Sequence, residues 1–370
     1  MTELPSALGY RMPAEWEPHA STWLAWPHNE EDWPGKFRPI PWVYAEIVRH
    51  LVRSEPVNVI VQGEKGERKA RKCLTRADVP ADRVTFHLWK TDRVWLRDTG
   101  PSFVVRDGEG DGPRLGVVDW RFNAWSKYDN FDRDDRIPKR IAERDGLPRW
   151  KPVENVGEET LRIVLEGGAI DVNGLGTILT TEECLLSEIQ ARNPLLDRAS
   201  MEKAFADYLG CTKTIWLNRG IVGDDTHGHV DDIARFVAPG TVVAAVEEDS
   251  SDPNHEPLQE NLDRLKSAKD QRGRSLRVVT LPMPRAIEFE GQRLPASYAN
   301  FFIANSVVLV PTFNDPADRE ALKILAGLFK DRQVVGIHSV DLVWGLGTLH
   351  CLSREQPAGK IADSIEDSSP

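Results

Sequence analysis

The sequence predicts an α/β fold built from about five repeats of a strand hairpin, a helix and a further strand. Strand-like segments come in pairs, and Gly, Asn or Pro stands in the turn between the members of each pair. Distinctive residues recur at comparable places, with successive gaps of 68, 63, 71 and 51 residues: Asp98, Glu166, His229, Asn300 and Cys351. This spacing favours a repeat or propeller-like architecture over an ordinary open sheet.

Helical segments of ordinary globular length lie between the strand pairs. The first places Val43, Ile47 and Val48 on one apolar stripe, and the last begins at the cap residue Asp315, which precedes a proline. Pro194 divides the third segment into two helical stretches. The expected helical segments are 42–53, 64–76, 184–209, 256–271 and 316–330.

The expected strands follow the chain in hairpins, and each hairpin precedes one of the helices or a final strand. Four hairpins are formed by 94–105 with 114–122, 161–172 with 176–186, 231–238 with 241–248, and 298–304 with 307–313. A strand at 333–339 precedes the last segment, 345–353. We expect residues 1–360 to form a single domain and residues 361–370 to be a disordered tail.

Composition excludes several classes of protein. The chain has 370 residues, a formal net charge of −11, and 40% hydrophobic residues, which is typical of a globular protein that binds neither nucleic acid nor an anionic membrane. Four scattered cysteines without a C-x-x-C motif exclude a disulfide framework and a zinc ribbon. We see no signal peptide and no run of 18 apolar residues, so we expect a cytoplasmic location; a homo-oligomer is left open.

The richest stretch for chemistry is Gly223–Asp232, which holds four carboxylates and two histidines. In an extended chain His227, His229 and Asp231 would share one face. One reading is a divalent-metal site of an amidohydrolase, with carboxylates completing the ligand shell. The other is a general acid–base His229 flanked by Asp231, with a nucleophile supplied from elsewhere.

Cys351 is the cysteine in the most suggestive setting, because it follows the small residues Gly345 and Gly347, which let a ligand approach closely. Asp98 lies at an expected strand end before a Gly-Pro turn, and Glu166 lies in an apolar strand before two glycines. A charge in such a place is costly unless it is paired. If the repeats circle an axis, these residues converge on one site, and its carboxylates would match a planar guanidinium cation.

These motifs carry a family resemblance. The chain resembles the agmatine deiminases of the guanidino-modifying (pentein) superfamily nearly from end to end, through MPAEWEPHASTWLAWPHNEEDW, WLRDTGPSF, LEGGAIDVNGLGTILTT, GDDTHGHVDDIARF and GLGTLHCLSREQP. The resemblance implies a five-bladed α/β propeller of pseudo-fivefold ββαβ units. It also implies hydrolysis of agmatine to N-carbamoylputrescine and ammonia, a step of putrescine and polyamine synthesis, without a metal or cofactor.

Carried over by motif, the resemblance implies roles for individual residues. Asp98 and Asp231 would clamp the guanidinium group, Glu166 would orient His229, and Cys351 would be the nucleophile. Trp95 would wall the guanidinium pocket, and Asp225 is a further candidate for binding the substrate. The expected partner is therefore a small cationic guanidino compound.

The sequence departs from the usual family pattern at His227 and at Gly345-Leu346-Gly347. A protonated His227 would disfavour the distal ammonium of agmatine, so the substrate could instead be another alkylguanidine, arginine or a peptidyl arginine. Two further functions fit the same residues: a metal-dependent amidohydrolase, and a propeller that binds a guanidino ligand without chemistry.

Overall fold

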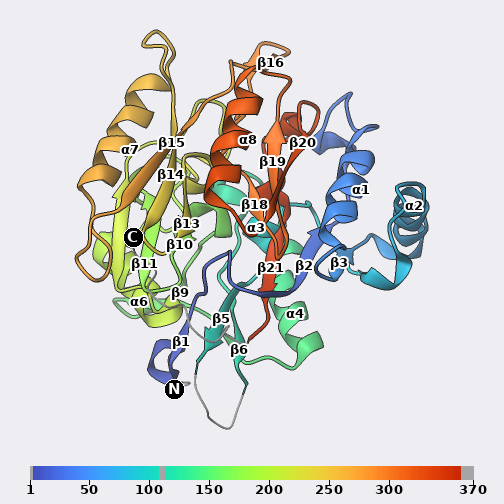
Figure 1. The fold of residues 1–370 in the computed structure, drawn as a ribbon. Coiled ribbons are helices and arrows are strands. Elements are labelled where there is room, and N and C mark those ends of the chain that lie inside the picture. Colours follow the sequence, from blue (N-terminus) through green and yellow to red (C-terminus); the bar gives the residue numbers. More distant parts are fainter. Residues whose placement is uncertain (1–2, 108–112, 360–370) are drawn as a thin grey trace.

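The computed structural model describes residues 3–107 and 113–359 as a mixed α/β structure (Figure 1). The expected tail at 361–370 lies outside the described residues. In the part that is described, five sheets share one plan, in which an antiparallel strand pair is extended by a parallel strand that follows a helix. The alternation of hairpin, helix and strand that the sequence predicts is therefore present.

The strands of these sheets have the following bounds. They are, sheet by sheet, β1 (Tyr10–Arg11), β5 (Ser102–Arg106), β6 (Leu115–Val118) and β7 (Arg149–Trp150); β10 (Asp171–Val172), β11 (Thr177–Thr181) and β12 (Lys213–Leu217); β13 (Ala234–Ala238), β14 (Thr241–Val246) and β15 (Arg277–Pro282); β18 (Phe302–Ile303), β19 (Val307–Thr312) and β20 (Gln333–His338); β21 (Arg354–Pro357), β2 (His19–Ala25), β3 (Val57–Ile60) and β4 (Val84–His87). Two small hairpins add β8 (Val153–Val156) with β9 (Glu159–Arg162) and β16 (Glu288–Phe289) with β17 (Gln292–Arg293).

The longer helices lie between the strands that pair in parallel, as the crossover between parallel strands requires. Those expected from the sequence are α1 (Ile40–Leu51), α2 (Gly63–Arg76), α5 (Glu182–Leu186), α6 (Arg198–Leu209), α7 (His255–Ser267) and α8 (Ala317–Leu328). The sequence reading missed α4 (Ile137–Asp145), because only a narrow stripe of this polar helix is apolar and buried.

β21 pairs antiparallel with β2, so segments from opposite ends of the sequence share a sheet (Figure 1). The core beneath this sheet contains much of the tryptophan in the chain. Trp23 and Trp33 are fully buried, and Trp26 and Trp95 are nearly so. These tryptophans therefore fill core volume for the most part.

The five distinctive residues each lie just before a strand of a different sheet. Asp98 is in the short helix α3 (Leu96–Thr99) before β5, and Cys351 is in the short helix α9 (Leu349–Leu352) before β21. Glu166 precedes a 3-10 turn and β10, His229 precedes a 3-10 turn and β13, and Asn300 precedes β18. The expectation that Asp98, Glu166 and Cys351 lie in or at the end of strands is therefore wrong.

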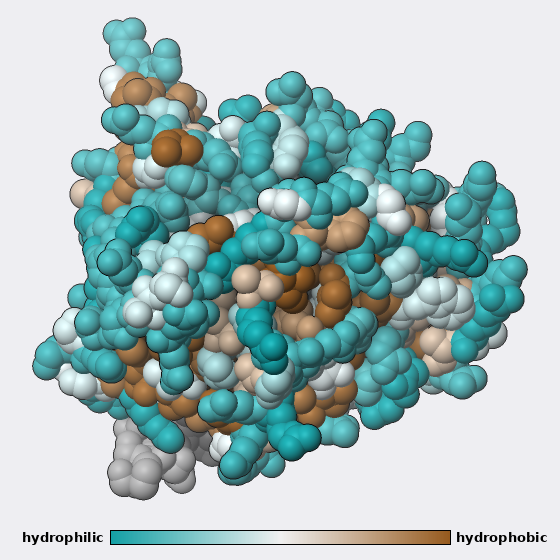
Figure 2. All heavy atoms as spheres, turned by 90° about the horizontal axis from the view of Figure 1, so that it is seen from above, coloured by the Kyte–Doolittle hydropathy of each residue, from teal (hydrophilic) through white to brown (hydrophobic). Residues whose placement is uncertain are grey.

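Tertiary packing brings together the segments that precede these strands, since α3 packs against α9 and against the turn that follows Glu166. Among the described residues, no helix combines the length and apolar character that crossing a membrane requires. The face seen in Figure 2 is mostly hydrophilic, with hydrophobic residues gathered around a central hollow.

Candidate active site

A cavity of about 300 Å³ opens where these segments meet. Its volume lies at the lower end of the range for small-molecule sites. The thiol of Cys351 and the carboxylate of Asp98 line it together with aromatic and further acidic side chains. The lining residues are Asn29, Glu31, Asp32, Arg93, Trp95, Asp98, Trp125, Tyr128, Asn130, Asp225, Thr226, Gly345, Leu346, Gly347 and Cys351.

Cys351 is held beside an asparagine and beneath a tryptophan. The Asn300 amide Nδ2 donates a hydrogen bond to the Cys351 Sγ at 3.2 Å, and the Asn300 Oδ1 accepts one from the Thr348 hydroxyl at 2.7 Å. Gly347 is required for this packing, because a Cβ at that position would lie 2.8 Å from the Trp95 ring and 3.1 Å from the Cys351 Cβ. The glycine therefore lets the aromatic wall close over the thiol.

Asp98 is buried and oriented by two donors from other segments. The Trp125 indole N–H donates to its Oδ2 at 2.9 Å, and the Gly168 backbone N–H donates to its Oδ1 at the same distance. Gly168 also permits the approach of His229, since a Cβ there would lie 2.5 Å from the His229 Nδ1. The segments that carry Asp98 and His229 therefore both pack closely against Gly168.

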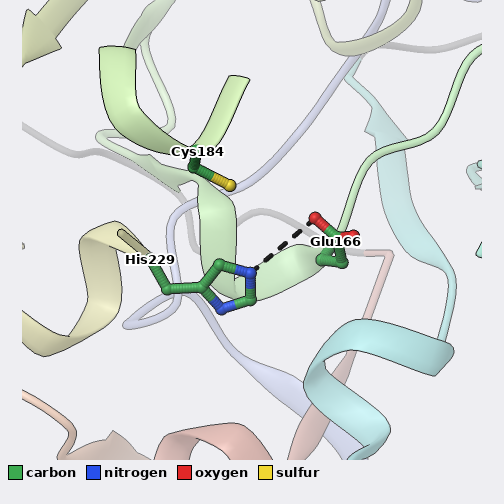
Figure 3. A group of neighbouring side chains, drawn as sticks. All are labelled: Glu166, Cys184 and His229. Atoms are coloured by element: carbon green, nitrogen blue, oxygen red, sulfur yellow. Dashed lines mark ion pairs between the residues drawn. The ribbon is translucent and has the colours of Figure 1, made fainter. Parts of the chain in front are cut away.

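His229 lies between carboxylates on both sides of its ring. Its Nε2 is 3.7 Å from the Glu166 Oε2 (Figure 3), and its Nδ1 is 3.9 Å from the Asp98 Oδ2 and 4.0 Å from the Asp231 Oδ1. Arg192 donates from Nε to the other Glu166 oxygen, Oε1, at 3.1 Å. Nε2 therefore faces a structural ion pair, while Nδ1 faces the carboxylates nearest the cavity.

A buried chain of polar contacts fixes Asp231. Its Oδ2 lies 2.6 Å from the His350 Nδ1, and the His350 Nε2 lies 2.7 Å from the Glu15 Oε2. Glu15 in turn pairs with Arg97 at 3.1 Å and with Arg235 at 2.9 Å. The same Asp231 Oδ2 is 3.8 Å from the Cys351 Sγ, so the chain positions a carboxylate next to the thiol.

Burial and the neighbouring charges set the protonation of these groups. Burial, with Asp231, Asp232 and Asp98 adding to it, raises the pKa of the Cys351 thiol well above its usual range. Burial would lower the pKa of His229, but Asp98 and Glu166 raise it well above the usual value. These shifts favour the imidazolium form of His229 and the neutral thiol form of Cys351.

Burial has different outcomes for the three carboxylates. Burial raises the pKa of Asp98, a shift that His229 partly opposes. Burial would also raise the pKa of Glu166, but Arg192 and His229 lower it to about 2. For Asp231 the contact with His350 outweighs burial, and the pKa is lowered. The buried carboxylates beside the cavity therefore suit a cationic ligand.

The structure brings together the five residues assigned catalytic roles from the sequence: Asp98, Glu166, His229, Asp231 and Cys351. Trp95 also lines the cavity, as expected. Asp225 lines it too, but it already forms an ion pair with Lys127 and accepts a hydrogen bond from Tyr128 at 2.8 Å.

The expected common face of His227, His229 and Asp231 does not form. His227 has a positive φ of 62°, and its Nε2 lies 3.1 Å from the Ser187 hydroxyl in a separate surface hollow. Val230 to Asp232 form a 3-10 turn in place of an extended strand. The metal site proposed for these three side chains is therefore wrong, and His227 gives no reason to disfavour a distal ammonium.

Sequence reasoning missed four residues that shape the site. Asn300 was noted for its spacing but received no role, and Trp125, Arg192 and His350 were not considered. The position of His350 directly before Cys351 was an available signal. The other three have partners that are distant in the sequence; Asn300 and Cys351, for example, are 51 residues apart.

Comparison with known proteins agrees with this geometry. Residues 11–357 match the family model of the Porphyromonas-type peptidyl-arginine deiminases. The agmatine deiminase of Pseudomonas aeruginosa (strain LESB58) is 36% identical over 98% of this chain and 99% of its own.

Two solved structures are similar over nearly the whole fold. The agmatine deiminase of Enterococcus faecalis superposes with a TM-score of 0.85 at 34% identity and covers 96% of this chain and 98% of its own. A substrate-bound variant of the C. jejuni agmatine deiminase gives a TM-score of 0.80 at 27% identity, with 94% and 96% covered. The chain therefore belongs to the Porphyromonas-type peptidyl-arginine deiminase family.

Proposed function

We propose that the protein hydrolyses the guanidinium group of agmatine to N-carbamoylputrescine and ammonia. The observation that carries this proposal is the Cys351 thiol in a small cavity, 3.8 Å from the Asp231 carboxylate, with Asp98 in the same wall. A planar cation bound between Asp98 and Asp231 would neutralise their charges and hold its central carbon next to the sulfur.

The substrate itself activates the nucleophile. In the free protein the carboxylates oppose a thiolate, since they raise the pKa of Cys351. A bound guanidinium adds a positive charge and removes that repulsion, so Cys351 loses its proton when substrate is present. The thiolate then attacks the guanidinium carbon and forms a carbon–sulfur bond.

His229 serves as acid and then as base. As an imidazolium it protonates the departing nitrogen, and the carbon–nitrogen bond breaks. Ammonia departs, and an amidino-thioether remains on Cys351. The neutral ring next takes a proton from water, which attacks the same carbon. Collapse breaks the carbon–sulfur bond, releases the ureido product and passes the hydroxyl proton to the sulfur, which restores the thiol. Glu166 favours the imidazolium and fixes the ring through Nε2.

Further charged residues of the cavity bear on the identity of the substrate. Glu31 and Asp32 line it, and carboxylates suit the distal ammonium of agmatine. Arg93 lines the same region, 3.3 Å from Asp32, and a guanidinium suits a carboxylate such as that of free arginine. Arginine is therefore the second candidate substrate.

A substrate panel tests the proposal. Agmatine, arginine and a peptidyl arginine are each incubated with the wild type and with Cys351→Ala, and ammonia and ureido product are measured. We expect the wild type to release both products fastest from agmatine, and Cys351→Ala to release neither. Ureido product from Cys351→Ala would refute the mechanism, while preference for arginine would move the assignment to the second candidate.

The remaining expectations are part of the same proposal. The plan that the five sheets share supports a five-bladed propeller built as one domain. All four cysteines are free, which suits a reducing compartment such as the cytoplasm, and an oxidised Cys351 could not attack the substrate.

A further inference from the structure

A third side chain lies beside the His229–Glu166 pair and has no role in the proposed reaction. Cys184, on α5, points toward that pair (Figure 3), and ligand atoms of Glu166, Cys184 and His229 all lie within 4.8 Å of one another. The three side chains are almost completely buried. Within residues 3–107 and 113–359, neither the His229 Nε2 nor the Glu166 Oε2 has a hydrogen-bond partner.

Two unpartnered polar atoms that are buried next to each other are costly, and a cation between them would satisfy both. Tetrahedral zinc with bonds of about 2.0–2.3 Å places its ligand atoms about 3.4–3.7 Å apart. The His229 Nε2 and the Glu166 Oε2 are already 3.7 Å apart. The Cys184 sulfur lies within 4.8 Å of both atoms, and imidazole, thiolate and carboxylate are the ligand types that zinc prefers.

The surrounding charges permit a dication at this point. Arg192 opposes it, but Arg192 bonds the other Glu166 oxygen and so leaves Oε2 free. Asp98 and Asp231 lie within 4.0 Å of the opposite ring nitrogen of His229 and offset the added charge. The cluster thus has more carboxylates than cations.

We propose that Zn²⁺ binds Glu166 Oε2, Cys184 Sγ and His229 Nε2 and thereby inhibits the enzyme reversibly. The Cys184 thiol and the His229 Nε2–H both give up their protons to solvent as the zinc–sulfur and zinc–nitrogen bonds form. A ring whose Nε2 lone pair is bound to zinc carries its one proton on Nδ1 and cannot accept a second. His229 then cannot take a proton from the water that attacks the amidino-thioether, so the product is not released. The inhibition rests on the proposed function, whereas the binding of zinc does not.

The fold offers a route for the ion. α5 has five residues, and its Glu182 and Glu183 line a second surface hollow together with Ser187 and His227. Arg198 and Arg219 also line this hollow, and Glu182 is paired with Arg198 at 2.5 Å, so Glu183 and His227 are the groups that remain to meet a divalent cation there. Displacement of this short helix would admit the ion without passage through the substrate cavity.

Binding is tested without turnover by titrating Co²⁺, which takes zinc sites and absorbs in the near ultraviolet when a thiolate binds it. The wild type, Cys184→Ser, Cys351→Ser and a control, Cys73→Ser, are compared. Cys73 lies on α2, and its thiol donates a hydrogen bond to the Pro41 carbonyl, which a serine hydroxyl can also do. Melting temperatures verify that each variant is folded.

We expect the thiolate absorption in the wild type, Cys351→Ser and Cys73→Ser, and its loss in Cys184→Ser. In the ammonia assay, the Zn²⁺ concentration for half inhibition should rise at least about tenfold in Cys184→Ser and stay unchanged in Cys73→Ser. Absorption lost in Cys351→Ser but retained in Cys184→Ser would place the metal on the nucleophile and overturn the proposal. Absence of absorption in the wild type would overturn it as well, whether or not agmatine is hydrolysed.

Discussion

Replacing Asp231 by asparagine should make Cys351 more reactive toward iodoacetamide while agmatine turnover falls. The Asp231 Oδ2 lies 3.8 Å from the Cys351 Sγ, and the carboxylate contributes to the raised pKa of the thiol. At an effective dielectric constant of about 20, a unit charge at this distance opposes the thiolate by about 4 kcal/mol. Its removal would enlarge the thiolate fraction at neutral pH by up to about a thousandfold.

A less basic thiolate is also a weaker nucleophile, with a Brønsted coefficient of about 0.4–0.5. This offset leaves an expected acceleration of alkylation on the order of tens of fold. Turnover falls nevertheless, because the amide no longer neutralises the guanidinium. The two rates thus change in opposite directions, which simple damage to the site would not produce.

The assay follows alkylation of Cys351 at pH 7 by peptide mass spectrometry, alongside ammonia release from agmatine. Glu31→Gln is the matched control, since Glu31 lines the same cavity but is exposed and its charge is screened by solvent. Its alkylation rate should stay within about twofold of the wild type. An unchanged or slower rate in Asp231→Asn would refute the electrostatic account of the resting thiol.

Three further predictions concern other parts of the site. Asp98→Asn should lower kcat by orders of magnitude, because an amide cannot stabilise the cationic adduct; a near-normal kcat would mean that the pocket is misplaced. Glu166→Gln should lower the pKa of His229, because a negative charge that favours the imidazolium is removed. The basic limb of the pH profile of kcat should then move to lower pH, and an unshifted limb would contradict the role of Glu166. Gly347→Ala should raise KM for agmatine, because its Cβ would meet the Trp95 ring, whereas Gly327→Ala, with open space around it, should leave KM unchanged.

The hairpins and most helices could be predicted because their signals are local. Gly and Pro in turns and apolar periodicity need no distant partner, and α1 and α8 were found within a few residues of their bounds. The short helices that carry Asp98 and Cys351 were missed, since four residues are too few for a periodic pattern. Their geometry depends on packing between connections.

The five catalytic assignments came from motifs, but their partners did not. His350 contacts Asp231, 119 residues earlier, and Glu15, 335 residues earlier, and neither distance is encoded in a local pattern. The displacement of His227 is similar, because its positive φ turns the ring toward Ser187 in place of the face shared with His229. Extended-chain alternation could not anticipate a turn at that point.

One functional group of the site lies just before a strand of each of the five sheets. Enzymatic activity therefore requires that all five sheets are folded at the same time. Asp98, Glu166, His229, Asn300 and Cys351 each enter the site on a different sheet, so the melting of any one sheet removes a group that the others cannot replace. Residual activity in a denaturant titration would therefore count only molecules in which all five sheets are intact. Helical circular dichroism, which sums contributions from every sheet's helix, should persist beyond the point at which turnover is lost.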